Sequence, residues 1–174
     1  MRLSPGDSFP TDDVAYVGAP SDREIDALVV TNDENVYLTT ALDVMGEVRV
    51  DVAEPPVDDA RGYDVVVFSN VDPERVLEGT IADVRREVED GAGVVVQSQP
   101  DIAEVGYGGL LLLGPGEVGV QTDVRTVESH PIVDGVGFVP ARAYVSGDLR
   151  RGTALAVADD GSPMIAVDDV GAGR

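Results

Sequence analysis

The sequence predicts an α/β fold built on a mainly parallel sheet, with extra β-strands in its C-terminal half. Apolar runs at 27–30, 64–68 and 93–96 are short and rich in valine, as in strands that are buried on both faces. Segments with helical spacing separate these runs. Helical crossovers between apolar strands make the strands parallel and place helices on both faces of the sheet.

The first predicted unit is a strand at 27–30, a helix and a second strand. The helix is expected from about Asn35, and Gly46 stands where a helix C-cap belongs. Val48 and Val52 belong to an alternating apolar and polar run, which favours a strand at the sheet edge. The apolar residues expected to share one face of the helix are Tyr37, Leu38, Ala41, Leu42 and Met45.

The second predicted unit is a strand, a helix and a central strand at 93–96. Asp72 is the expected helix cap, Pro73 suits the first helical position, and Glu74 suits the positive end of the helix dipole. Apolar residues then recur with helical spacing as far as Gly91. We therefore expect a helix that starts at Asp72 and ends at Gly91.

The C-terminal half has a different pattern, with short strand candidates between Gly, Pro and Asp residues and no long helix. We expect these strands to extend the sheet or to form an antiparallel flap against it. The candidates are 110–113, 124–127, 143–145, 154–157 and 164–167. At the other end, residues 1–24 are rich in turn signals and are interpreted as an arm or the end of a preceding element, so the domain is 25–174.

The chain is strongly acidic, with 33 Asp and Glu against 12 basic residues, all of them Arg, and a net charge of −21. Such self-repulsion opposes folding unless salt screens it, so we interpret the protein as adapted to high salt. The scattered arginines argue against nucleic acid and anionic membrane surfaces as partners. No apolar run is long enough to span a bilayer, and the absence of Cys excludes disulfides and thiolate chemistry.

Polar loops follow the predicted parallel strands, and ligands of open α/β sheets bind beyond these carboxyl ends. The expected pocket residues are Asn32, Asp33, Asn70, Asp72, Ser98 and Gln99. None of these loops has the Gly-x-Gly-x-x-Gly pattern that admits a pyrophosphate, so no nucleotide cofactor is predicted. The sequence predicts no cofactor of any other class.

Two of these acids, Asp33 and Asp72, resemble the acidic pocket of phosphoacceptor receiver domains. Receiver domains also need an aspartate that ends the third strand and a later lysine. Here Ser69 and Asn70 occupy that place, and the chain has no lysine. We therefore predict no metal site, and interpret these acids as solvated or helix-capping groups.

Ser98 is the candidate nucleophile, because it follows a strand where α/β hydrolytic enzymes place theirs. A nucleophile elbow needs glycines, whereas Val96 and Pro100 stand at those positions. His130, the only histidine, would be the base for Ser98. The alternative is structural, with His130 shaping the loop entry before Pro131.

Several segments together resemble class I glutamine-amidotransferase-like domains. The most similar versions lie within large haloarchaeal and bacterial membrane proteins of the aerotolerance-operon type, which also carry a von Willebrand factor A domain. The leading segment, 7–13, resembles the region that precedes the domain in those proteins. The segments that carry the resemblance are 63–68, 72–74, 89–94, 130–136, 160–166 and 171–174.

This resemblance implies a flavodoxin-like three-layer α/β sandwich, truncated at its C-terminus. Active members of the wider superfamily use a cysteine nucleophile, which this chain lacks. It therefore implies a non-catalytic binding or structural module of a larger, membrane-anchored halophilic protein. Its partners would be proteins or other domains of the same polypeptide. The alternative is a hydrolase- or transferase-like enzyme that uses Ser98 with His130.

Overall fold

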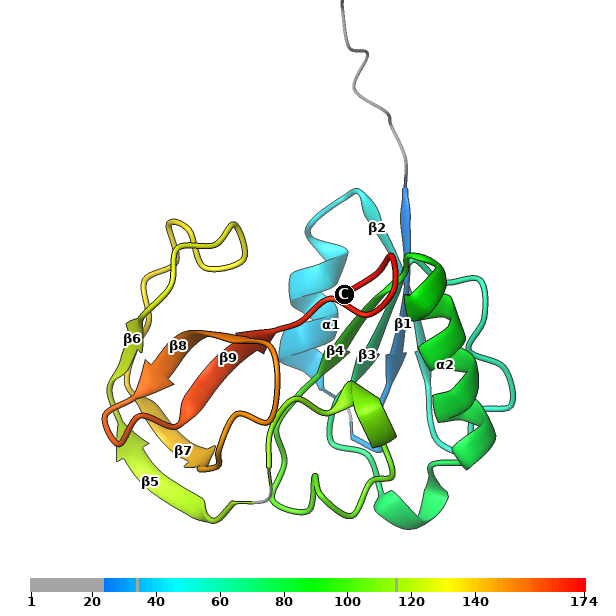
Figure 1. Cartoon of the computed structure of the whole chain (residues 1–174). Coiled ribbons are helices and arrows are strands. Elements are labelled where there is room, and N and C mark those ends of the chain that lie inside the picture. Colours follow the sequence, from blue (N-terminus) through cyan, green and yellow to red (C-terminus); the bar gives the residue numbers. More distant parts are fainter. Residues whose placement is uncertain (1–23, 34, 115) are drawn as a thin grey trace, which may run out of the picture.

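The computed structural model describes residues 24–33, 35–114 and 116–174 (Figure 1). The predicted arm at 1–24 therefore lies, except for its last residue, outside the described residues. Two regions follow each other along the chain. A parallel sheet with two helices comes first, and antiparallel strands beside it form the second half. The prediction of an α/β fold with a parallel sheet and further C-terminal strands is confirmed.

The parallel sheet has four strands in the order β2-β1-β3-β4. They are β1 (Ile25–Val30), β2 (Val48–Ala53), β3 (Val65–Phe68) and β4 (Gly93–Val96). Every pair of neighbours in this sheet is parallel. β2 lies at an edge, as its alternating pattern predicts. β4 does not lie at the centre of the sheet as we expected, because its second side has no strand of the sheet beside it.

Helix α2 (Glu78–Asp90) packs on one face of this sheet. Its buried residues Ile81, Val84 and Val88 meet the β1 and β3 side chains that point to the same face. The predicted helix start at Asp72 is wrong. Asp72 does cap, accepting a hydrogen bond from Glu74 N, but the turn that it caps is a three-residue 3-10 turn. The next residues are extended, and α2 begins afterwards.

Helix α1 (Val36–Asp43) follows β1 and lies on the other side of the sheet in Figure 1. Asn35 caps it, since its side chain accepts a hydrogen bond from Leu38 N at 3.2 Å. The predicted core face is wrong in part, because the Tyr37 side chain is 92% exposed and Met45 is also exposed. None of the residues of α1 is fully buried. A short helix therefore covers this face incompletely.

A row of four valines across the sheet shows how much of this face is buried. Val52, Val29, Val67 and Val95 are register partners on successive strands and point to the α1 side. The two central valines are buried, whereas Val52 and Val95 on the edge strands are 57% and 52% exposed. On this face, therefore, the middle of the sheet is covered and its two edges are exposed to solvent.

The second half contains two small antiparallel sheets, β5-β7 and β6-β8-β9. The predicted strand at 110–113 is absent, because a 3-10 turn occupies Gly108–Leu110 and an isolated bridge joins Leu113 to Leu149. An unpredicted strand, β5, lies further along. The strands are β5 (Val118–Thr122), β6 (Val124–Thr126), β7 (Ala141–Val145), β8 (Thr153–Ala158) and β9 (Pro163–Val167).

The last residues return to the parallel sheet. Gly171 has φ +64°, and a Cβ there would come within 2.4 Å of the Glu89 carbonyl oxygen at the end of α2. A Cβ on Gly173 would lie 2.2 Å from two carbonyl oxygens, those of Val88 and Ala92. Both positions therefore need glycine for this close approach. In the part of the chain that is described, no helix is long and apolar enough to cross a bilayer.

Candidate functional site

The carboxyl ends of β1 and β3 bring four of the predicted pocket residues together. Asn32 follows β1, and its Oδ1 accepts a hydrogen bond from the backbone N of Asp72 at 2.7 Å. The side-chain amide of Asn70 donates to the Asp33 carboxylate. Asn70 has a left-handed φ of 48°, which an asparagine tolerates better than most residues. These residues link the loops after the two strands to each other.

Gln99 anchors the loop after β4 to the loop after β3. Its Oε1 accepts from Val71 N at 2.9 Å, and its Nε2 donates to Val71 O at 2.8 Å. Nε2 also donates to Asp101 Oδ1 at 2.5 Å. The Gln99 residue is 4% exposed, so the amide satisfies buried backbone groups and is not presented to a ligand.

A second polar cluster at this edge was not among the predicted pocket residues. Asn35 Nδ2 donates to Ser69 Oγ at 2.7 Å and to Gln97 Oε1 at 3.3 Å, and Ser69 Oγ donates to Gln97 Oε1 at 2.5 Å. The signal in the sequence was the same as for the predicted set, since Ser69 and Gln97 each directly follow a parallel strand. This cluster ties the N-terminus of α1 to β3 and β4.

An ion pair between Arg75 and Glu54 lies near this edge. Arg75 Nη1 lies 2.5 Å from Glu54 Oε1, and Asn32 Nδ2 donates to the same oxygen at 3.5 Å. The hydrogen bond from Arg75 and its charge hold the pKa of the Glu54 carboxyl below its usual value. Among the described residues, no group of three or more His, Asp or Glu side chains could hold a metal ion.

Ser98 and His130 are not brought together. His130 Nδ1 accepts a hydrogen bond from Ile132 N at 3.2 Å, and its Nε2 lies 3.2 Å from Arg174 Nη1. His130 lines a cavity of about 470 Å³ beside Thr153 and Asp169, whereas Ser98 lines a different one. Within the described ranges, no hydrogen bond joins the two side chains. His130 is therefore engaged in its own loop and with the end of the chain.

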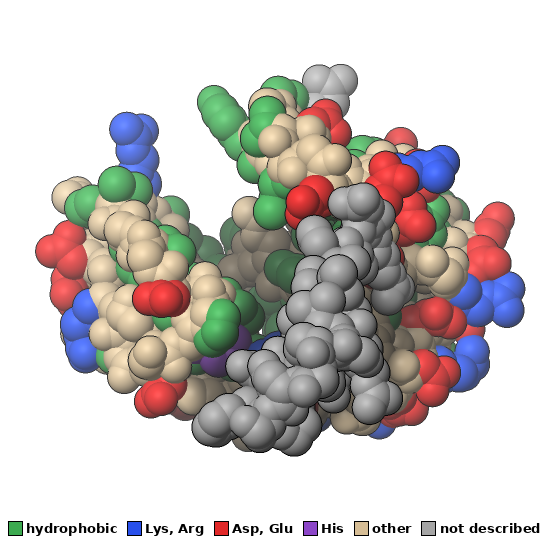
Figure 2. Space-filling model, turned by 90° about the horizontal axis from the view of Figure 1, so that it is seen from above, with side chains coloured by type: hydrophobic (Ala, Val, Ile, Leu, Met, Phe, Trp, Pro, Cys, Tyr) green, Lys and Arg blue, Asp and Glu red, His purple; other side chains and the backbone are tan. Residues whose placement is uncertain are grey.

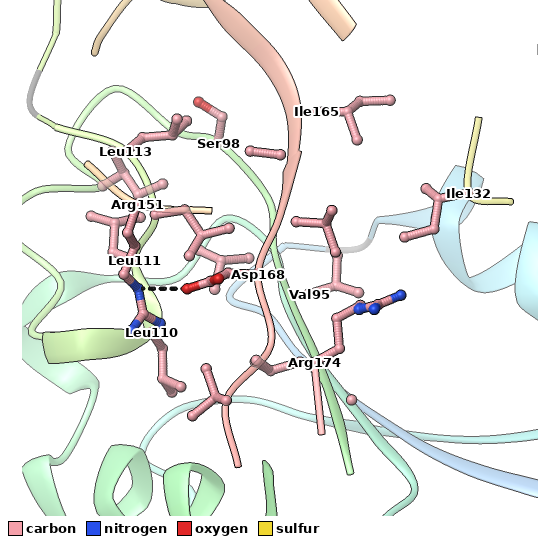
Figure 3. Close-up of a pocket in the computed structure, with 18 of the residues that line it drawn as sticks. Val95, Ser98, Leu110, Leu111, Leu113, Ile132, Arg151, Ile165, Asp168 and Arg174 are labelled. Carbon is pink, nitrogen blue, oxygen red and sulfur yellow. Dashed lines mark ion pairs between the residues drawn. The ribbon is translucent and has the colours of Figure 1, made fainter. Parts of the chain in front are cut away.

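The cavity that Ser98 lines has a volume of about 490 Å³ and is bounded mainly by aliphatic side chains (Figure 3). It lies between β4, the segment 110–113 and β9. Its charged lining includes an ion pair, with Arg151 Nε 3.3 Å from Asp168 Oδ2. Seen from above, the surface is hollowed between the antiparallel strands and the parallel sheet, and hydrophobic side chains lie in the hollow (Figure 2). The sequence could not indicate this cavity, because its walls come from segments far apart in the chain.

Comparison with known proteins supports the fold and identifies the family. The solved structure of an exo-β-1,4-mannosidase, Op5Man5 from Opitutaceae bacterium strain TAV5, is similar, with a TM-score of 0.51 and 14% sequence identity. The match covers 85% of this chain and 30% of that chain, so this chain spans about a third of the mannosidase and the likeness concerns the fold alone. No curated protein sequence matches the chain. Residues 26–174 match the family described as a domain of unknown function, DUF7408, and the chain therefore belongs to the DUF7408 family.

Proposed function

We propose that this domain is a non-catalytic, amidotransferase-like binding module of a larger halophilic protein that is tethered to a membrane. The observation that carries the proposal is the use of the polar side chains at the strand ends. Asn32, Asn35, Ser69 and Gln99 bond to one another's loops or to backbone groups. These bonds hold the loops together, and within the described residues no hydrogen bond joins Ser98 to His130, as a nucleophile and its base would require.

A flavodoxin-like three-layer arrangement is part of this proposal. Both faces of the central strands β1 and β3 are buried, as a sheet between two helical layers requires. α2 supplies one layer, and α1 lies on the opposite side (Figure 1). The proposed adaptation to high salt is supported by the net charge of −21 and by the ion pairs at the surface, each of which uses arginine.

The test is a search for Ser98-dependent chemistry in a buffer with KCl on the order of 1 M, where repulsion among the acids is screened. The protein is incubated with a fluorophosphonate probe, a p-nitrophenyl ester and glutamine, and labelling, phenolate and ammonia are measured. We expect signals no higher than those of Ser98→Ala. Ser129→Ala is the matched control, because Ser129 is also an exposed serine of a loop and lies next to His130.

Labelling or turnover that is lost in both Ser98→Ala and His130→Ala but kept in Ser129→Ala overturns the proposal. That result would instead establish the hydrolase- or transferase-like alternative. Equal background in all four proteins supports the non-catalytic function.

A further inference from the structure

The loop between β6 and β7, residues 127–140, has few ties to the rest of the fold. Its first two residues donate from their backbone to Leu155 O of β8, at 2.8 and 3.3 Å. From residue 129 onwards, the backbone hydrogen bonds of the described structure stay inside the loop, where Val133 N and Asp134 N both donate to His130 O. Within this loop Val133 alone is buried. The loop extends away from β6 (yellow in Figure 1).

One polar contact joins the later part of this β6–β7 loop to another part of the chain. Nε2 of His130 lies 3.2 Å from Nη1 of Arg174, and within the described ranges no other polar contact links residues 129–140 to the rest of the fold. Arg174 is itself fixed, because its backbone bonds to Ala92 O and Val94 N beside β4. Its guanidinium also bonds to Asp169 at 2.8 Å. His130 therefore attaches the loop to a residue that is bound to the parallel sheet.

Both ring nitrogens of His130 face N–H donors. The backbone N–H of Ile132 donates to Nδ1 at 3.2 Å, and the Arg174 guanidinium lies at Nε2. A neutral imidazole has one nitrogen that can accept a hydrogen bond, whereas an imidazolium has none, because both of its nitrogens are donors. Protonation therefore removes the acceptor for which these two donors compete. It also places a positive charge 3.2 Å from a guanidinium, so the protonated ring cannot keep its present contacts.

The cavity beside His130 contains carboxylates that can accept from a protonated ring, and the β8 residues that line it are uncharged. The charged residues of this region are Glu128 and Asp134 of the loop, Asp168 and Asp169 after β9, and Arg151 and Arg174. Both aspartates after β9 are already paired with these arginines, at 3.3 and 2.8 Å. Glu128 forms no ion pair within the described residues. Because Glu128 belongs to the same loop as His130, a bond between the two leaves the loop unattached to Arg174.

Apolar packing is a weak alternative anchor for the β6–β7 loop. Val133 is buried, but Ile132 is half exposed where it lines the aliphatic cavity near Val95 (Figure 3). Holding the loop in one conformation costs backbone entropy at every residue, which a single buried valine offsets only in part. The contact between His130 and Arg174 therefore decides whether the loop stays in place.

We propose that the β6–β7 loop is a pH-sensitive strap, which neutral His130 holds against Arg174 and which protonation of His130 releases. On release, the imidazolium donates to the Glu128 carboxylate, and the Ile132 amide loses its acceptor. Histidine is the side chain that ordinarily changes its charge between pH 5 and 8, and His130 is the only histidine of the chain. The inference goes beyond the proposed function, because it concerns the loop itself and requires neither a partner nor a reaction.

Molar salt does not abolish this response. The Debye length at 1 M is about 3 Å, which is comparable with the contact between His130 and Arg174, so the direct repulsion is only partly screened. The loss of an acceptor nitrogen is a change of bonding that salt does not reverse.

The experiment follows the 15N-labelled chain by NMR from pH 8 to pH 5.5 in KCl on the order of 1 M, above the range in which carboxylates ordinarily titrate. The His130 ring signals, the Ile132 amide shift and the 15N order parameters of the backbone are measured. We expect the ring and the Ile132 amide to change with one midpoint. The order parameters of residues 129–139 should fall from about 0.85 to below about 0.6, while those of β1 and β3 stay unchanged.

Three variants separate this strap from a general effect of pH. His130→Gln cannot be protonated, so its loop should show no pH dependence in this range. Arg174→Leu removes the residue to which the loop is attached, so its loop should already have low order parameters at pH 8. Arg151→Leu is the matched control, because Arg151 also pairs with an aspartate after β9 but has no bond to His130, and it should behave as the unaltered chain.

Order parameters that stay high while the His130 ring titrates overturn the inference, and so does a ring that stays neutral down to pH 5.5. The same fall in His130→Gln, or a loop in Arg174→Leu as ordered as that of Arg151→Leu at pH 8, also overturns it. If His130→Gln does not fold, the titration of the unaltered chain and the two arginine variants decide.

Discussion

The side-chain amide of Gln99 makes two hydrogen bonds to the backbone of Val71, as a neighbouring strand would: it donates to Val71 O at 2.8 Å and accepts from Val71 N at 2.9 Å. Both residues are buried. Gln99→Leu should therefore lower the free energy of unfolding by about 2 to 4 kcal/mol, because two buried backbone groups lose their partners. Urea denaturation monitored by circular dichroism measures the change.

Gln97→Leu is the control variant. Because Gln97 is exposed and water can replace its lost hydrogen bonds, this substitution should lower the free energy of unfolding by less than about 1 kcal/mol. Equal losses in the two variants would contradict this role of Gln99.

Tyr107 buries a hydroxyl group that has no hydrogen-bond partner among the described residues. Its ring meets Phe68 edge to face at a centroid distance of 5.2 Å, and burial raises the pKa of the phenol. Tyr107→Phe keeps the ring contact and removes the unpaired hydroxyl, so stability should stay equal or rise by about 1 kcal/mol.

Tyr144→Phe is the matched control for this substitution. Its hydroxyl donates to Asp160 at 2.7 Å, and the same change there should give no gain. Thermal denaturation of both variants makes the comparison. A clear loss of stability in Tyr107→Phe would show that the hydroxyl has a partner after all.

Gly173 allows the C-terminal segment to approach α2 and β4. A methyl group there meets two carbonyl oxygens at 2.2 Å, so Gly173→Ala should destabilise the fold by roughly 1 to 3 kcal/mol. Gly137→Ala provides the control, because a Cβ there meets nothing within 4 Å and its φ is not in the left-handed region. Urea midpoints of the two variants test the prediction, which fails if they shift equally.

High salt should stabilise this chain strongly. At molar KCl the Debye length falls to about 3 Å, so repulsion within a charge of −21 is screened. We expect the melting temperature to rise by about 10 °C or more between low and molar KCl, which corresponds to a few kcal/mol for a chain of this size. Sucrose, which is excluded from the surface but does not screen charge, serves as the control and should do less. A melting temperature that does not change with KCl concentration would contradict adaptation to high salt.

The central strands of the parallel sheet could be predicted because strands that are buried on both faces are continuous apolar runs in the sequence, as at β1 and β3. β4 has an equally apolar run, although it lies at the sheet edge and none of its residues is fully buried. β5 was missed, since Val118 and Val120 are exposed and Gly119 lies between them, so no burial pattern exists to detect. The position of β4 at the sheet edge could not be predicted either, because it depends on strand order and not on local composition.

Helix limits were harder to predict than strands. Asp72 has the side chain and neighbours of a cap, and it caps a turn, but such signals do not encode how many turns follow. At the candidate site, the loops after β1, β3 and β4 contact one another because parallel strands end at one edge of the sheet. The hydrogen-bond partners within these loops were not predicted, since whether Ser69 bonds to Asn35 or to a ligand depends on side-chain conformation.

Helix α1 has eight residues, none of them fully buried. Isolated helices of this length are marginal in water, so its stability depends on packing that this surface supplies only in part. Its amides should consequently open and reclose many times for each global unfolding event, while those of β1 and β3 exchange only when the whole domain opens. The domain would then consist of a rigid sheet and a locally labile helix. Since Asn35 joins that helix to Ser69 and Gln97, each opening would also release the polar cluster at the strand ends.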